Sequence, residues 1–320
     1  MNGLKILHII PNLGKGGAER MCLETCIQLK KDGHIVKLLI LEDINEYQEL
    51  SSELSFDFID VLKEFSIRKH RTKVFEEFKC FIQEYNPDVV HTHLFAAEMV
   101  WKLTKISIPT LFHIHDNIKV FTPFRTGLFN KVSWFTLYEK RVYLMLLKKQ
   151  PTYFLCVSND TQQYINARIK PYLNNIGIIH NSINTSTFDC LPRKELSEIK
   201  LISVGSLITL KGHKLLLQVV SELIRLTSKK ITLTLLGDGV LKGELELYAL
   251  ELGIKDLVLF KGKVERPQDY LKRANVYVHG AFKESFGLVL IEAMASNLPV
   301  FTTDGGGNRD VIEHEKTGFI

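Results

Sequence analysis

The sequence has little cysteine and no long apolar run. Its five cysteines are odd in number and scattered along 320 residues, which is typical of reduced thiols in the cytoplasm rather than of a disulfide framework. No stretch approaches the roughly 18 apolar residues that a membrane-spanning helix needs. The apolar run at the N-terminus is interrupted by His8 and stopped by Pro11, so it is too short for a signal peptide. We therefore predict a cytoplasmic protein.

Several catalytic motifs are also absent. The chain contains no Gly-x-Ser-x-Gly, no His-Glu-x-x-His and no Walker A sequence. It contains no Asp-x-Asp either, which argues against a site that depends on a divalent cation. Cys22 and Cys26 lie one helical turn apart, but no histidine or cysteine pair accompanies them at the spacing of zinc ligands. We predict no metal site.

Apolar segments alternate with helical ones along the chain. Runs rich in Ile, Leu and Val predict strands at residues 5–10, 35–41, 88–93, 110–115, 153–158 and 176–180, and then at 200–205, 231–237, 257–262, 276–280 and 299–303. Segments such as 18–31 and 213–226 predict helices between them. This alternation indicates an α/β fold with parallel sheets covered by helices on both faces.

The length and one polar break predict two domains. A chain of 320 residues is long for a single core, and the polar stretch 181–198 separates the two series of strands. We predict Rossmann-like doubly wound domains over residues 1–182 and 199–320, joined by a linker over 183–198. Ligands of such sheets bind beyond the carboxyl ends of the strands, so the polar residues there would share one cleft if the domains face each other.

Three glycine-rich turns follow predicted strands. GKGGAE (14–19) and TTDGGGNRD (302–310) each precede a predicted helix, where free N–H groups and the helix dipole favour an anion. In SVGSLITLKGHK (203–214), Lys211 adds an ammonium group at a helix start, which suits a diphosphate. The alternatives are plain tight turns and a solvated lysine.

Two histidines and two glutamates are further candidates. His93 and His115 end predicted strands, where an imidazole with a pKa near working pH could donate to a ligand; a purely structural role is the alternative. In KESFGLVLIEAMA (283–295), Glu284 and Glu292 are eight positions apart. We expect a helix from about Phe286 that is apolar on every side and therefore buried, so Glu292 needs a cation, backbone N–H groups or ligand hydroxyls as partners.

Residues 118–150 alternate basic and aromatic side chains, with Glu139 as the only acidic residue. Such a segment can lie on an anionic membrane surface, or it can be a core-covering helix with solvated lysines. The basic residues cluster here and nowhere else, so we predict no nucleic-acid partner despite the net charge of +5.

Together these motifs resemble the retaining glycosyltransferases of family 4, which have the two-domain GT-B fold. The resemblance covers nearly the whole chain. Its strongest part is ESFGLVLIEAMASNLPV (284–300), which matches the Glu-x7-Glu signature of the family. The supporting segments are GGAER, PDVVHTH, HNSIN, VGSLITLKGHK, LLGDG and GGNRDVIEHEKTGF, together with His115.

The resemblance implies roles for these residues. His115 and Glu284 would lie beside the donor sugar as catalytic residues, Lys211 would hold the diphosphate, and Glu292 would accept hydrogen bonds from the ribose hydroxyls. Val264 would contact the base, and backbone N–H groups would contact the sugar and phosphates. The other donor-binding positions that the resemblance implies are Gly16, Gly17, Ser206, Ser285, Phe286, Gly287 and Leu288.

The implied activity is transfer with retention from a nucleoside-diphosphate sugar, with UDP as the expected base, to a surface-polysaccharide or lipid-linked acceptor. No cofactor is expected, and the cytoplasmic enzyme would be peripheral at the membrane if segment 118–150 binds it. Ser206 stands where the family usually has arginine, and the chain stops at TGFI, short of the C-terminal helices expected of the family. The alternatives are a sugar-nucleotide epimerase of the same fold and a truncated, non-catalytic protein that binds glycan or membrane.

Overall fold

The computed structural model describes residues 3–64, 72–117, 121, 131–148, 152–169, 175–188 and 198–320. The chain divides into two compact units, Met1–Ile179 and His180–Ile320. Part of the expected linker belongs to the second unit, because Ile183 and Phe188 pack in its hydrophobic core. Residues 189–197 of that linker lie outside the described part of the chain.

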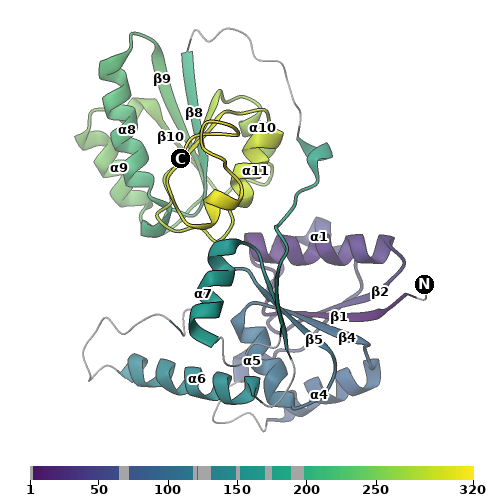
Figure 1. The fold of residues 1–320 in the computed structure, drawn as a ribbon. Coiled ribbons are helices and arrows are strands. Elements are labelled where there is room, and N and C mark those ends of the chain that lie inside the picture. Colours follow the sequence, from purple (N-terminus) through teal and green to yellow (C-terminus); the bar gives the residue numbers. More distant parts are fainter. Residues whose placement is uncertain are drawn as a thin grey trace. The chain divides into compact units, whose positions relative to one another are not determined.

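The first unit is built on a seven-stranded sheet in the order β3-β2-β1-β4-β5-β6-β7, and every pairing is parallel. The strands are β1 (Lys5–Ile10), β2 (Ile35–Ile40), β3 (Phe56–Phe58), β4 (Val89–His93), β5 (Thr110–Ile114), β6 (Tyr153–Cys156) and β7 (Asn175–Ile178). The helices are α1 (Gly17–Lys31), α2 (Gln48–Ser51), α3 (Val61–Glu64), α4 (Lys73–Tyr85), α5 (Phe95–Thr104), α6 (Lys131–Leu147) and α7 (Asn159–Ile169). Figure 1 shows α1 and α5 among the helices that pack around this sheet.

The second unit has a five-stranded parallel sheet in the order β10-β9-β8-β11-β12. Its strands are β8 (Glu198–Val204), β9 (Lys230–Leu236), β10 (Val258–Gly262), β11 (Val276–His279) and β12 (Val300–Thr302). Its helices are α8 (His213–Leu226), α9 (Lys242–Glu251), α10 (Pro267–Leu271) and α11 (Leu288–Ala295), with short 3-10 turns η3 (Thr185–Thr187), η4 (Thr209–Lys211), η5 (Lys255–Leu257) and η6 (Gly307–Asp310). Strands β9 and β10 lie on one side of β8, and strands β11 and β12 lie on the other. The switch point of the sheet is therefore between β8 and β11, and such sheets bind ligands at the switch point.

The predicted strands are all present, and three details differ from the sequence analysis. The three-residue edge strand β3 was not predicted. The helix expected from Phe286 begins at Leu288, because Gly287 precedes it with a positive φ of 92°. The turn at 302–310 leads into the short 3-10 helix η6 rather than an α-helix.

The segment 118–150 is described only in part. Residues 118–120, 122–130 and 149–150 lie outside the described residues, as do the side chains of 131–135. Four side chains of α6 are buried in the hydrophobic core of the first unit, so this helix covers that core: Val142, Tyr143, Leu146 and Leu147. None of the helices in the described ranges is both long and apolar enough to cross a membrane.

A polar network is buried between α5 and α6. The hydroxyl of Tyr143 donates to Oε2 of Glu98 at 2.8 Å, and Lys102, one turn along α5, donates to Thr152. Both Glu98 and Lys102 are enclosed. Burial raises the pKa of Glu98 to about 8, against the smaller lowering effect of the Tyr143 hydrogen bond, and burial lowers the pKa of Lys102 to about 8. Glu98 is therefore largely protonated at neutral pH.

This network predicts a pH-dependent effect of Glu98→Gln. The pKa of Glu98 is higher in the folded than in the unfolded chain, so the stability from the protonated carboxyl is fully present below about pH 4.3 and is lost as the pH rises through 8. Glutamine does not ionise, so the variant should gain about 1 kcal/mol of unfolding free energy relative to wild type per pH unit between 5 and 8. Urea denaturation at pH 5, 6.5 and 8 measures this difference. The exposed Glu49→Gln is the control, and parallel profiles for wild type and Glu98→Gln would contradict the assignment.

Candidate active site

The polar residues of the second unit gather at the carboxyl ends of β8, β11 and β12. The loop 205–212 follows β8, the loop 280–287 follows β11, and the loop 303–306 follows β12. These loops are joined by backbone hydrogen bonds. The N–H of Phe282 donates to the carbonyl of Leu210 at 2.9 Å, and that of Glu284 donates to Gly305 at 2.6 Å. The loops therefore form one connected surface at the switch point of the sheet.

An ion pair lies at the centre of this surface. Nζ of Lys211 donates to Oε2 of Glu284 at 2.6 Å, and Nε2 of His279 lies 3.2 Å from the same oxygen. The exposed fraction of the side chain is 25% for Lys211 and 13% for Glu284, so the pair is sheltered but reachable. Burial alone would raise the pKa of Glu284, but the His279 hydrogen bond and the Lys211 charge outweigh it and hold that pKa at about 2. The carboxylate is charged at neutral pH.

Close backbone packing holds Lys211 in place. Gly212 has a positive φ of 62° and lies against Gly280, and a Cβ on Gly212 would overlap the carbonyl oxygen of Gly280. The two loops that carry Lys211 and Glu284 can approach because neither glycine has a side chain. Gly307 likewise lies against the carbonyl of Ser285.

Three residues of this site were not singled out from the sequence. His279 ends β11 beside Glu284, and His213 is buried in the first turn of α8. Burial, then the neighbouring His279 and Lys211, lower the pKa of His213 to about 4. Asn308 is buried and donates to Thr302 Oγ1 at 2.9 Å, which ties η6 to β12. A histidine at a strand end is the same signal that indicated His93, so His279 was detectable.

The other predicted donor-binding residues of the second unit lie in the loops after β8 and β10 and at the start of α11 or within it. Ser206 is exposed in the loop after β8, and Val264 is half-buried against the hydrophobic core of the second unit. Phe286 is buried with its ring 5.5 Å from that of His180, and Ser285 and Leu288 are half-buried beside Gly287. Glu292 is 4% exposed within α11, as expected for a carboxylate in an apolar helix.

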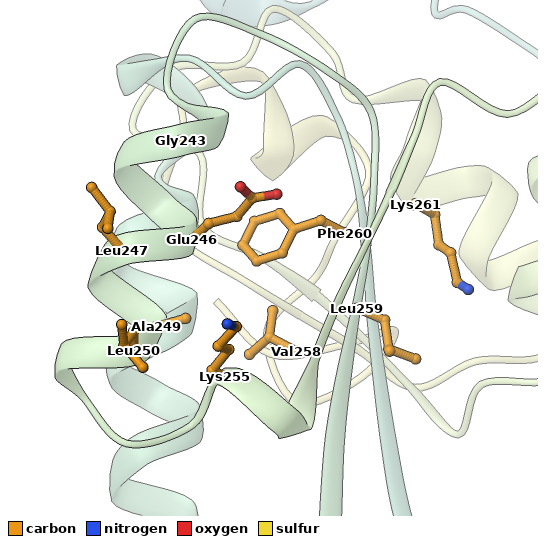
Figure 2. A pocket seen from close by; sticks show the side chains of 10 residues that line it. All are labelled: Gly243, Glu246, Leu247, Ala249, Leu250, Lys255, Val258, Leu259, Phe260 and Lys261. Atoms are coloured by element: carbon orange, nitrogen blue, oxygen red, sulfur yellow. The ribbon is translucent and has the colours of Figure 1, made fainter.

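A separate groove of about 730 Å³ lies between α9 and β10. Figure 2 shows its lining, which is mainly apolar and includes Leu250, Val258 and Phe260, with Lys255 between Leu250 and Val258. None of the predicted site residues lines it.

In the first unit, Gly16 and Gly17 form the start of α1. Gly16 is the N-cap residue, its carbonyl accepts a hydrogen bond from the Tyr47 hydroxyl at 2.9 Å, and a Cβ on it would overlap the carboxylate of Glu19. The turn was predicted to open a helix, and it does so at Gly17.

His93 and His115 lie at the carboxyl ends of β4 and β5, joined by a hydrogen bond of 2.9 Å between His93 Nδ1 and His115 Nε2. The expectation that their pKa lies near working pH is wrong. Burial, reinforced by the neighbouring imidazoles, holds the pKa of both side chains well below the usual range. Both are therefore neutral at pH 7.

Three groups of side chains in the described part of the first unit have donor atoms within 4.8 Å of one another, close enough to share a metal ion. They are His8, Cys22 and Cys26; His8, His91 and His93; and His93, His113 and His115. These groups have no zinc-ligand spacing in the sequence, because the elements that bring them together are far apart along the chain.

Comparison with known proteins decides the family. Residues 15–187 match the family Glycosyltransferase Family 4, and residues 192–320 match the family Glycosyl transferases group 1. The chain belongs to glycosyltransferase family 4. The chain is 26% identical over 267 residues to an uncharacterized glycosyltransferase of Methanocaldococcus jannaschii, a match that covers 78% of the chain and 62% of that relative.

Two further proteins match the chain over almost its whole length. One is the N-acetylgalactosamine-N,N'-diacetylbacillosaminyl-diphospho-undecaprenol 4-alpha-N-acetylgalactosaminyltransferase of Campylobacter jejuni, 25% identical with 99% of this chain and 85% of the relative covered. The other is the crystal structure of HepE from Anabaena in complex with UDP and glucose, with a TM-score of 0.77, 18% identity and coverage of 99% of this chain and 85% of that chain. With two parallel α/β sheets, the chain has the GT-B fold.

Proposed function

We propose that this glycosyltransferase moves a sugar from a nucleoside-diphosphate sugar, with UDP as its base, to a surface-polysaccharide or lipid-linked acceptor, with retention at the anomeric carbon. The observation that carries the proposal is the Lys211–Glu284 pair at the switch point of the second sheet. The UDP in the HepE structure supports the choice of base, and the name of the Campylobacter relative supports a lipid-linked acceptor.

Lys211 is the residue that stabilises the leaving diphosphate. As the glycosidic bond breaks, negative charge grows on the diphosphate and positive charge grows on the sugar ring. The ammonium of Lys211 lies at the start of α8, where the helix dipole adds positive potential. Glu284, charged and beside Lys211, faces the sugar and orients the ammonium. The acceptor hydroxyl attacks the anomeric carbon from the same face of the sugar ring from which the diphosphate departs. The leaving phosphate takes the proton of that hydroxyl.

The remaining residues bind the donor. Glu292 accepts hydrogen bonds from the ribose hydroxyls, and Val264 contacts the base. The N–H groups of Ser285, Phe286, Gly287 and Leu288, at the start of α11, contact the sugar and the phosphates, as do those of Ser206, Gly16 and Gly17. His115 contacts the sugar near the reacting carbon. Although α6 covers the core, segment 118–150 also holds the enzyme at an anionic membrane surface, through basic residues outside the core such as the exposed Arg141.

A thermal-shift panel tests this proposal. We expect UDP or a UDP-sugar to raise the melting temperature of the wild-type chain, because a ligand at 100 times its dissociation constant adds about 2.7 kcal/mol of stability. GDP, ADP and CMP counterparts should have no effect. Glu292→Ala should abolish the shift, whereas the exposed control Glu313→Ala should retain it.

Product analysis completes the test. Transfer to an acceptor with retained configuration supports the proposal, whereas an epimerised donor formed without acceptor would replace it with the epimerase alternative. A chain that is stabilised by no nucleotide and transfers no sugar would overturn it.

A further inference from the structure

Five histidines form one cluster on a single face of the first sheet, and the proposed function uses only one of them. His8 lies on β1, His91 and His93 on β4, and His113 and His115 on β5 and directly after it. β4 lies between β1 and β5, and alternate residues of a strand share a face. Neighbouring rings are therefore close, with centroids 4.1 Å apart for His113 and His115 and 4.3 Å apart for His91 and His93.

Within this cluster, three rings are hydrogen-bonded in series. Nδ1 of His8 lies 3.0 Å from Nε2 of His93, and Nδ1 of His93 lies 2.9 Å from Nε2 of His115. The outer nitrogens of the series, Nε2 of His8 and Nδ1 of His115, have no hydrogen-bond partner among the described residues. The series runs from His8, which is fully enclosed, to His115, which is half-buried at the strand end.

Counting protons leaves two arrangements for this series. Each hydrogen bond needs one N–H and one lone pair. In the first, Nδ1–H of His8 donates to His93, Nδ1–H of His93 donates to His115, and His115 carries its own proton on Nδ1. In the second, every bond is reversed, so that Nδ1 of His115 is a lone pair and Nε2 of His8 carries a proton.

One argument favours the first arrangement. It accommodates His8 whether that ring carries one proton or two, whereas the second requires a neutral His8 with a free lone pair on Nδ1.

We propose that His8 and His93 are positioning residues that hold His115 as its Nδ1–H tautomer, so that His115 donates a hydrogen bond to an oxygen of the donor sugar. The part played by the sugar rests on the proposed function, but the tautomer does not. The low pKa of His93 and His115 is consistent with this role, because only a neutral imidazole has one donating and one accepting nitrogen.

Nitrogen NMR of ¹⁵N-histidine-labelled protein tests the tautomer directly, with the His115 signals assigned by their loss in His115→Asn. We expect wild-type His115 to be protonated on Nδ1 with or without UDP. His93→Phe and His8→Leu each remove a link, so both should give a mixture of His115 tautomers. His8→Asn should restore the single tautomer, because its amide can occupy the position of Nδ1.

Kinetics of sugar transfer test the consequence. We expect kcat to fall about 10-fold or more in His93→Phe and about 5-fold in His8→Leu with little change in KM, and to recover in His8→Asn. His91→Phe is the matched control, since the His91 ring packs against those of His8 and His93, with centroids 4.6 and 4.3 Å apart, but is not part of the hydrogen-bonded series. It should change stability without changing the tautomer or kcat.

The outcomes separate this inference from the proposed function. A wild-type His115 protonated on Nε2 overturns the inference, and so does a His115 tautomer that is the same in His8→Leu, His93→Phe and wild type. Absence of sugar transfer by the wild-type chain overturns the proposed function instead, and the NMR result then still decides whether the series fixes the tautomer.

Discussion

Lys211→Met is expected to lower kcat for sugar transfer by about 100- to 1000-fold, the cost of removing one group that stabilises developing charge. Methionine keeps much of the length of the side chain but removes the ammonium that lies 2.6 Å from Glu284. The effect should fall mainly on kcat, because the negative charge on the diphosphate is largest when the glycosidic bond breaks. Steady-state kinetics with a UDP-sugar and acceptor measure both constants.

Lys214→Met is the matched control for this prediction. Lys214 lies three residues further along, at the start of α8, and its ammonium is 3.7 Å from Glu244 in an exposed pair that contributes little. Its loss should change kcat less than twofold. Equal kinetics in the two variants would show that Lys211 does not stabilise the leaving group.

The sequence predicted the arrangement of strands and helices well because both sheets are parallel and buried. Apolar runs such as KILHII and VYVHG have one interpretation in a chain where amphipathic helices alternate with them. The strand β3 was missed because it has three residues and lies at a sheet edge, with Phe56 and Phe58 both exposed. A run of three residues is too short to show the alternation of apolar and polar side chains that indicates a strand.

The site was predictable in its residues but not in its contacts. Lys211 and Glu284 were each identified, but they are 73 residues apart, and their ion pair depends on β8 pairing with β11. The same holds for the histidine series, which depends on β4 lying between β1 and β5. The pKa of His115 was predicted in the wrong range because burial, the main cause of its shift, depends on packing around the strand ends.

Gly212→Ala is expected to destabilise the second unit by about 3 kcal/mol, which is large for a single added methyl group. Two effects add. Alanine is strained at a φ of 62°, and its Cβ would overlap the carbonyl oxygen of Gly280, which is backbone and cannot rotate away. The loop carrying Lys211 would have to move away from the loop carrying Glu284, so sugar transfer should fall together with stability.

Gly243→Ala, in the same unit, is expected to leave the stability unchanged or to raise it. Gly243 lies in α9, is exposed, and a Cβ on it would meet nothing within 4 Å. Alanine is the better helix former by up to about 1 kcal/mol, so this variant should melt at the same temperature as wild type or higher. Thermal unfolding followed by circular dichroism compares the three proteins. Melting of Gly212→Ala within one degree of Gly243→Ala would mean that the two loops do not pack against each other through these glycines, and the geometry that holds Lys211 beside Glu284 would then need another cause.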